Sequence, residues 1–165
     1  MGLQSPVYLV QGGAIDIDRG QLNLLGLEQM TRAGDWLRAQ GLGERALVMS
    51  GTERYKQESA AMICVELGAT VLAAPSLDTA SAYPDSIVDL DFTLTRAVHE
   101  TGSDPSDYHG IVVIAGRPLM DAARLFVPHV SNIKPTDRTT GGSIVQYVPE
   151  TWPAIRRAAN LMPAA

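Results

Sequence analysis

The chain has 165 residues, of which 45% are apolar, and this composition suits a single domain, residues 1–165, with a real hydrophobic core. Its 13 basic and 18 acidic side chains give a formal net charge of −5, so we expect no nucleic-acid partner, because phosphate backbones bind basic surfaces. The single cysteine, Cys64, excludes an intramolecular disulfide, and no apolar run is long enough to span a membrane. Together with the lack of a signal peptide, these features predict a cytoplasmic protein without a membrane partner.

Short apolar runs alternate with amphipathic stretches along the chain. Five runs are typical of buried strands: Val7–Val10, Ala46–Met49, Thr70–Ala73, Ile111–Ile114 and Ser143–Val148. Helical spacing and capping residues predict helices that begin near Asn23, Glu53, Ile87, Pro118 and Thr151. Four polar stretches are expected to be loops: Gln11–Leu22, Pro75–Pro84, Ser103–Gly110 and Val130–Gly142. This alternation predicts an α/β three-layer sandwich, with a mostly parallel central sheet and helices on both faces.

Two of the predicted strands end in glycine turns. Gln11, Gly12 and Gly13 follow the first strand directly, and Gly116 and Arg117 follow the fourth strand after one alanine. In α/β domains, ligands bind at the carboxyl ends of the strands. We expect the two turns to lie side by side there, and glycine lets a ligand approach the backbone closely.

Ordered motifs surround these two turns. In chain order they are Val7–Gly13, Leu22–Gln29, Ser50–Glu58, Ile111–Leu119 and Gly142–Val148. Together they resemble the motifs of the histidine phosphatase superfamily, whose fold is called phosphoglycerate mutase-like. The resemblance covers nearly the whole chain and is closest to the short branch, the bacterial phosphohistidine phosphatases. It implies the fold of that family.

The same resemblance implies that both catalytic histidines are missing. In that family the first strand ends in Arg-His-Gly, and its histidine accepts the phosphoryl group. Here Gln11 stands at the arginine position and Gly12 at the histidine position, while Gly116 replaces the second histidine of the pocket. Arg54 matches the arginine that binds phosphate in that family. Because glycine cannot form a phosphohistidine, the resemblance implies a pseudoenzyme with no catalytic residues for phosphatase or mutase activity.

These positions predict a ligand-binding pocket made by Gln11, Gly12, Gly13, Arg54, Gly116 and Arg117. Arg117 stands at the start of a predicted helix, where free N–H groups and the helix dipole favour an anion. In the alternative interpretation, the glycines only serve tight turns and the arginines form surface ion pairs. The candidate partners of the arginines are then Glu53, Glu58 and Asp121.

Other polar residues are expected to have structural roles. Asp16 and Asp18 could be general bases or magnesium ligands, but no third ligand is visible, which favours a solvated acidic loop. Ser50 has no histidine or lysine at motif spacing to activate it, which favours a turn residue. The three histidines match no zinc motif and are expected at the surface, and Cys64 is expected to be a small buried hydrophobe. We therefore expect no metal and no cofactor.

Three functional hypotheses follow. The first is a catalytically degenerate protein that binds a small anionic or polar ligand, or a protein partner, through the vestigial pocket. The second is an enzyme repurposed for non-phosphoryl chemistry in the same pocket, because positioning and electrostatics alone can accelerate a reaction. Its polar candidates are Gln11, Asp16, Arg54 and Arg117. The third is a pure protein-interaction module, which a filled or flat pocket would favour. The sequence indicates neither the ligand nor the oligomeric state.

Overall fold

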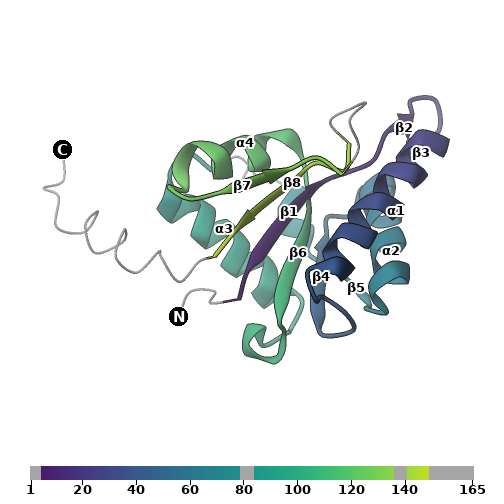
Figure 1. Cartoon of the computed structure of the whole chain (residues 1–165). Helices are drawn as coiled ribbons and strands as arrows, with labels where there is room; N and C mark the ends of the chain where they lie inside the picture. The colour runs from purple at the N-terminus through teal and green to yellow at the C-terminus, as the bar shows by residue number, and fades with distance from the viewer. Residues whose placement is uncertain (1–4, 79–83, 136–140, 149–165) are drawn as a thin grey trace, which may run out of the picture.

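The centre of the molecule is a six-stranded sheet (Figure 1). The computed structural model of the chain describes residues 5–78, 84–135 and 141–148. The strand order is β5-β4-β6-β1-β8-β7. These strands are β1 (Val7–Gln11), β4 (Ala46–Ser50), β5 (Val71–Ala73), β6 (Gly110–Ala115), β7 (Ser131–Ile133) and β8 (Ile144–Tyr147). The pairs from β5 to β1 are parallel, and β8 is antiparallel to both β1 and β7, which confirms the mostly parallel sheet.

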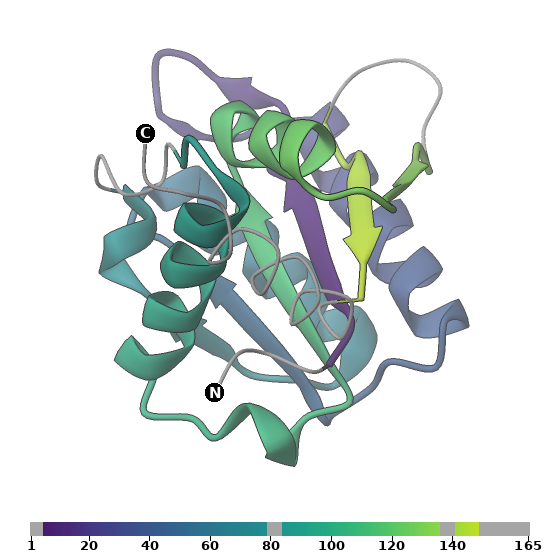
Figure 2. The ribbon, with the colours of Figure 1, turned by 90° about the vertical axis from the view of Figure 1, so that its left-hand side faces the viewer.

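Helices cover both faces of this sheet and give three layers (Figures 1 and 2). On one face lie α1 (Leu24–Ala39) and α2 (Arg54–Leu67), and on the other lie α3 (Ile87–Glu100) and α4 (Arg117–Phe126). Successive side chains of a strand point to opposite faces. In β1, Val7 and Leu9 therefore join the core beneath α3 and α4, whereas Tyr8 and Val10 join the core beneath α1 and α2.

The helix ends follow the capping signals in the sequence. The side chain of Asn23 caps α1 by accepting a hydrogen bond of 2.8 Å from the Gly26 N–H. Ser86 caps α3 in the same way, at 3.0 Å from the Asp89 nitrogen. Gly68 ends α2 with a φ of 71°, a conformation that glycine adopts without strain. The longest of these helices, α1, has 16 residues, and none within the described parts of the chain is both long and apolar enough to cross a membrane. The helix predicted from Thr151 lies outside the described residues.

All four predicted loops contain regular structure, so these predictions were partly wrong. The stretch 103–110 contains the 3₁₀ helix η3 (Pro105–Asp107). The stretch 130–142 contains the edge strand β7, and the stretch 11–22 contains a small hairpin of β2 (Ile15–Asp16) and β3 (Gln21–Leu22). The stretch 75–84 begins with the 3₁₀ helix η1 (Pro75–Asp78). Two of the three β7 residues are exposed. An edge strand without a buried face lacks the alternation of apolar residues that predicts a strand.

Candidate functional site: a cavity between two glycine turns

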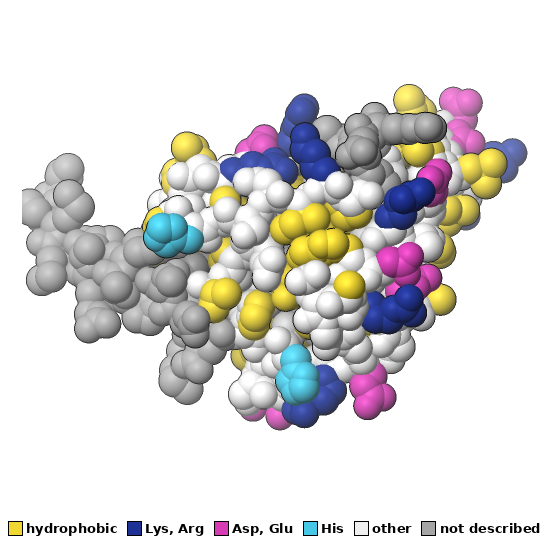
Figure 3. Space-filling model, viewed as in Figure 1, with side chains coloured by type: hydrophobic (Ala, Val, Ile, Leu, Met, Phe, Trp, Pro, Cys, Tyr) yellow, Lys and Arg dark blue, Asp and Glu magenta, His cyan; other side chains and the backbone are white. Residues whose placement is uncertain are grey.

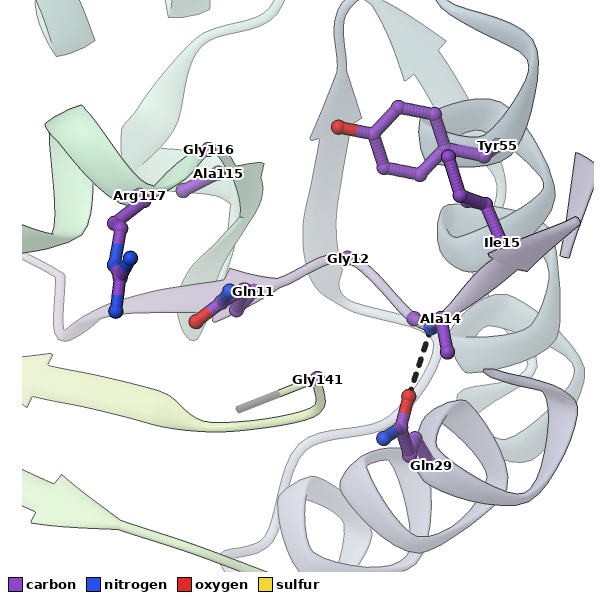
Figure 4. A pocket seen from close by; sticks show the side chains of 11 residues that line it. Gln11, Gly12, Ala14, Ile15, Gln29, Tyr55, Ala115, Gly116, Arg117 and Gly141 are labelled. Carbon is purple, nitrogen blue, oxygen red and sulfur yellow. Dashed lines mark hydrogen bonds between the residues drawn. The ribbon is translucent and has the colours of Figure 1, made fainter. Parts of the chain in front are cut away.

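The two glycine turns lie side by side at one edge of the sheet. β1 and β6 are parallel neighbours, and their last residues, Gln11 and Ala115, are partners in register. A cavity of about 370 Å³ opens between the turns, a size suited to a small molecule. It is lined by Gln11, Gly12, Gly13, Ala14, Ile15, Gln29, Tyr55, Ala115, Gly116, Arg117 and Gly141 (Figure 4). The structure thus brings together all the expected pocket residues except Arg54.

Buried polar side chains hold the backbone of the first turn in place. Ser59 Oγ accepts a hydrogen bond of 3.2 Å from the Gly13 N–H and donates one of 2.7 Å to the Tyr55 carbonyl. Gln29, fully buried on α1, accepts a hydrogen bond of 2.8 Å from the Ala14 N–H (Figure 4). These two N–H groups of the turn are therefore engaged within the protein. The first turn is therefore a fixed wall of the cavity, and its Gly13 and Ala14 N–H groups are not free to donate to a ligand.

The first turn is also crowded. A β-carbon on Gly12 would lie 3.0 Å from Cε2 of Tyr55, so the tyrosine ring occupies the space into which a side chain at position 12 would point. A β-carbon on Gly13 would lie 2.8 Å from the Gly26 carbonyl oxygen, and one on Gly26 would collide with the Ala14 carbonyl. Glycine at positions 12, 13 and 26 thus allows α1 and α2 to close on the turn.

The second turn is open by comparison. Among the described residues, a β-carbon on Gly116 would meet only Pro118 Cδ at 3.6 Å and Lys56 Nζ at 3.9 Å. Both are ordinary contact distances. The space beside Gly116 is therefore free for a ligand atom, and the nearest polar group is an ammonium.

Arg117 supplies a charged group beside this open turn. It is the first residue of α4, a helix of 10 residues, so it stands where the free N–H groups and the helix dipole attract anions. Its side chain is exposed, and no acidic residue in the described parts of the chain pairs with it. The carboxylate of Asp121 instead lies 3.1 Å from Arg124. In Figure 4, Arg117 and Gln11 lie across the cavity from Tyr55.

Lys56 lies beside the second turn, on the first turn of α2, and is not among the residues that line the cavity. Its side chain is 10% exposed, and Nζ is 2.9 Å from Oε1 of Glu53 and 5.9 Å from the centre of the Tyr55 ring. Burial by itself lowers the pKa of Lys56, but the hydrogen bond to Glu53 and the negative charges of Glu53 and Asp78 outweigh it. The pKa of Lys56 therefore lies above its ordinary value. The ammonium is charged at neutral pH.

Arg54 is placed differently from the expectation. It does not line the cavity, its side chain is 65% exposed, and its Nε lies 3.9 Å from Glu58. This is the surface ion pair of the alternative interpretation. A role of Arg54 in ligand binding has no support from the cavity geometry and stays a prediction.

The remaining candidate residues stand apart from this cavity. Asp16 Oδ1 accepts a hydrogen bond of 3.0 Å from the Asp18 N–H within the β2–β3 hairpin, and Ser50 Oγ donates one of 3.0 Å to the Gly51 carbonyl. Burial raises the pKa of Cys64 to about 11, as expected of an inert thiol. The histidines are exposed at positions 99, 109 and 129. Across the ranges that the structure describes, no three histidine, cysteine or acidic side chains are grouped to hold a metal.

Comparisons with known proteins identify the fold. The structure of a putative phosphohistidine phosphatase, SixA, from Agrobacterium tumefaciens matches with a TM-score of 0.51 at 11% identity, covering 73% of each chain. A putative SixA from Nakamurella multipartitia matches with a TM-score of 0.50 at 20% identity, covering 72% of this chain and 62% of that one. This chain has the phosphoglycerate mutase-like fold. No protein-family model and no curated protein sequence matches it, so the likeness is one of fold.

Among the residues in or beside this cavity that the sequence does not single out, three carry polar side chains. Gln29 belongs to a motif but was not expected to brace the first turn. Tyr55 and Lys56 follow Arg54 directly in the chain, and the family resemblance points to the arginine rather than to them. A signal for Lys56 was present, because it precedes the buried Ala60 by one helical turn and so lies on the buried face of α2.

Proposed function

We propose that this chain is a catalytically degenerate protein that binds a small anionic or polar ligand between the two glycine turns, without phosphoryl transfer. The chemistry of the cavity lining carries this proposal. None of the 11 residues that line the cavity is a histidine, and the only hydroxyl among them belongs to Tyr55. Burial raises the pKa of that phenol, so it is neutral and a poor nucleophile. Such a lining can hold and orient a ligand but offers no group to accept a phosphoryl.

Charge favours an anion among the polar ligands. No carboxylate is among the described residues that line the cavity, and the Arg117 guanidinium is the charged group among them. Figure 3 shows Lys and Arg side chains along the edge of the molecule that α4 and β7 form. Arginine binds phosphate or carboxylate through two parallel hydrogen bonds, and the N-terminus of α4 adds its dipole.

Titration followed by NMR tests the proposal on the intact chain, with inorganic phosphate as the probe. We expect the amide signals of Gly12, Gly116 and Arg117 to move together as phosphate is added. Arg117→Gln should weaken binding about tenfold, because a hydrogen bond to a charged group contributes about 1.5–3 kcal/mol. Arg96→Gln is the matched control, since Arg96 is a half-exposed arginine on α3 paired with Glu100. It should leave the affinity unchanged.

An activity assay tests the second half of the proposal. The wild-type chain should hydrolyse neither phosphohistidine nor an aryl phosphate above the buffer rate. Turnover of either substrate at an ordinary enzymatic rate, about 1–1000 per second, would refute the non-phosphatase assignment.

Exposed apolar side chains beside the cavity favour a protein partner as a second candidate. They lie on the β2–β3 hairpin and the start of α1, at the upper right of Figure 3, and are Ile15, Ile17, Leu24, Leu25 and Leu27. Large apolar side chains exposed on neighbouring segments are a feature of interaction sites. Cross-linking in the native extract should capture one specific protein with the wild-type chain and lose it with Ile17→Ser/Leu24→Ser. Val65→Ser, a change at an exposed apolar residue on α2, should not affect the capture.

A further inference from the structure

A buried ammonium group lies beside the second turn. Among the described residues, the Lys56 ammonium has one acceptor, Glu53 Oε1 at 2.9 Å. An ammonium carries three N–H donors, so two are left for another acceptor. Lys56 Nζ lies 3.9 Å from the place where a β-carbon on Gly116 would stand. Lys56 is not among the residues that line the cavity, but its ammonium lies beside Gly116, which is. A ligand group in the space that Gly116 leaves open would therefore lie near this ammonium.

The position of this charge is unfavourable for stability alone. Lys56 lies in the first turn of α2, where the positive end of the helix dipole repels a cation. A buried charge with a single partner seldom recovers its loss of hydration, and an apolar side chain of the same length often serves the fold equally well. Packing therefore does not account for the ammonium. The two remaining N–H donors of Lys56 account for the ammonium better, because they can donate hydrogen bonds to a ligand atom in the cavity.

We propose that Lys56 is a second anion-binding group of this cavity, and that the ligand carries an oxyanion, a phosphate or a carboxylate, seated beside Gly116 within reach of Lys56 and Arg117. This inference rests on the proposed function and deepens it. Gly116 supplies the space, Arg117 and the N-terminus of α4 hold the oxyanion from the front, and Lys56 holds it from the back. Glu53 keeps the lysine side chain in place, which limits the rotamer entropy that binding would otherwise cost.

The small number of lysines makes a direct test practical. The chain contains two, Lys56 and Lys134, so lysine-selective isotope labelling gives two side-chain signals in the intact protein. Lys134 is exposed and follows β7. We expect the Lys56 Cε signal to move with the same midpoint as the amide signals of Gly116 and Arg117. The Lys134 signal should stay in place. Parallel titrations with inorganic phosphate and with malonate decide which oxyanion the site prefers.

Matched variants test the contribution of the charge. Lys56→Met removes the charge and keeps the length of the side chain, and Lys134→Met makes the same change at the surface. We expect Lys56→Met to raise the Kd for the preferred anion at least tenfold, Lys134→Met to change it less than twofold, and Lys56→Arg to restore part of the loss. The thermal midpoint of Lys56→Met should equal or exceed that of the wild type, which a purely structural lysine would not allow.

The outcomes separate this inference from the function on which it rests. If the amide signals of the turns move while Lys56 stays still and Lys56→Met binds normally, the role of Lys56 is wrong and the proposed function stands. Equal losses of affinity in Lys56→Met and Lys134→Met would show that only the net charge of the protein affects binding, and this would overturn the inference. If neither anion moves any signal, both proposals fail. Should Lys56→Met not fold, the labelled wild-type chain still decides the question.

Discussion

The two glycine turns look alike in the sequence and differ in the structure. The first is closed, because the Tyr55 ring lies 3.0 Å from where a β-carbon on Gly12 would stand. The second is open, because a β-carbon on Gly116 would meet nothing closer than 3.6 Å among the described residues. Glycine thus makes room for the protein itself in the first turn and leaves open space in the second. The same residue type can therefore mark a filled site or a vacant one, and only its neighbours distinguish the two.

The close packing of the first turn is tested most severely at Gly26. Alanine would force a methyl group into the Ala14 carbonyl, which is backbone and cannot rotate away. We expect the free energy of unfolding to fall by about 2–3 kcal/mol, although alanine is the better helix former. Urea denaturation measures the change. Gly43→Ala is the control, because its β-carbon would meet only the Leu67 carbonyl at 3.9 Å. Equal stability of the two variants would contradict the crowding of this turn.

A change at Gly12 tests the role of Tyr55 in the closed turn. Gly12→Ala should lower the free energy of unfolding by about 1–2 kcal/mol, since the tyrosine ring must shift. Combining it with Tyr55→Leu should remove most of that penalty, because the smaller side chain leaves room for the methyl group. A double-mutant cycle gives the coupling, which we expect to be about 1 kcal/mol. Additive effects would show that the ring does not close this turn.

Gly116→Ala probes the open turn with the same added methyl group. Its β-carbon would make ordinary contacts, so we expect the free energy of unfolding to stay within about 0.5 kcal/mol of the wild type. Phosphate affinity should nevertheless drop several-fold, because the methyl group occupies the space beside Lys56. Calorimetric titration measures the affinity. If Gly116→Ala is unstable but binds phosphate with the wild-type affinity, the second turn is closed rather than open, and the contrast between the two turns is wrong.

The smallest effect is expected at Arg54. Its ion pair with Glu58 is long and exposed, and such pairs contribute about 0–1 kcal/mol. Arg54→Ala should change the stability within that range and leave the phosphate Kd within a factor of two. A loss of affinity comparable to that of Arg117→Gln would show that Arg54 contacts the ligand, as the resemblance to the phosphatases implies.

The sequence predicts the fold well because the fold depends on strong, local signals. Continuous apolar runs predict β1, β4 and β6, and Asn23 and Gly68 mark helix ends by capping chemistry that needs no tertiary information. The adjacency of the two turns also follows, since a right-handed crossover places parallel strands in few arrangements. The edge strand β7 is not predicted because two of its three residues are polar and exposed, so it lacks the apolar alternation typical of a strand.

The site is harder to predict because it depends on contacts between helices. The Tyr55 ring of α2 fills the space beside Gly12, and whether it does so depends on how closely α1 and α2 approach. That distance cannot be calculated from spacing along the chain. Lys56 is a partial exception. Helical spacing places it on the buried face of α2, but only the structure shows that its ammonium lies beside Gly116.

The lone thiol of Cys64 has a practical consequence for all of these measurements. It is 7% exposed and burial raises its pKa to about 11, so it reacts slowly with thiol reagents near neutral pH. A cysteine introduced on the surface would be the one readily labelled position of the chain. Fluorescent or spin labels could therefore be attached one at a time around the mouth of the cavity, for example at the exposed Ile17, without first removing the native residue.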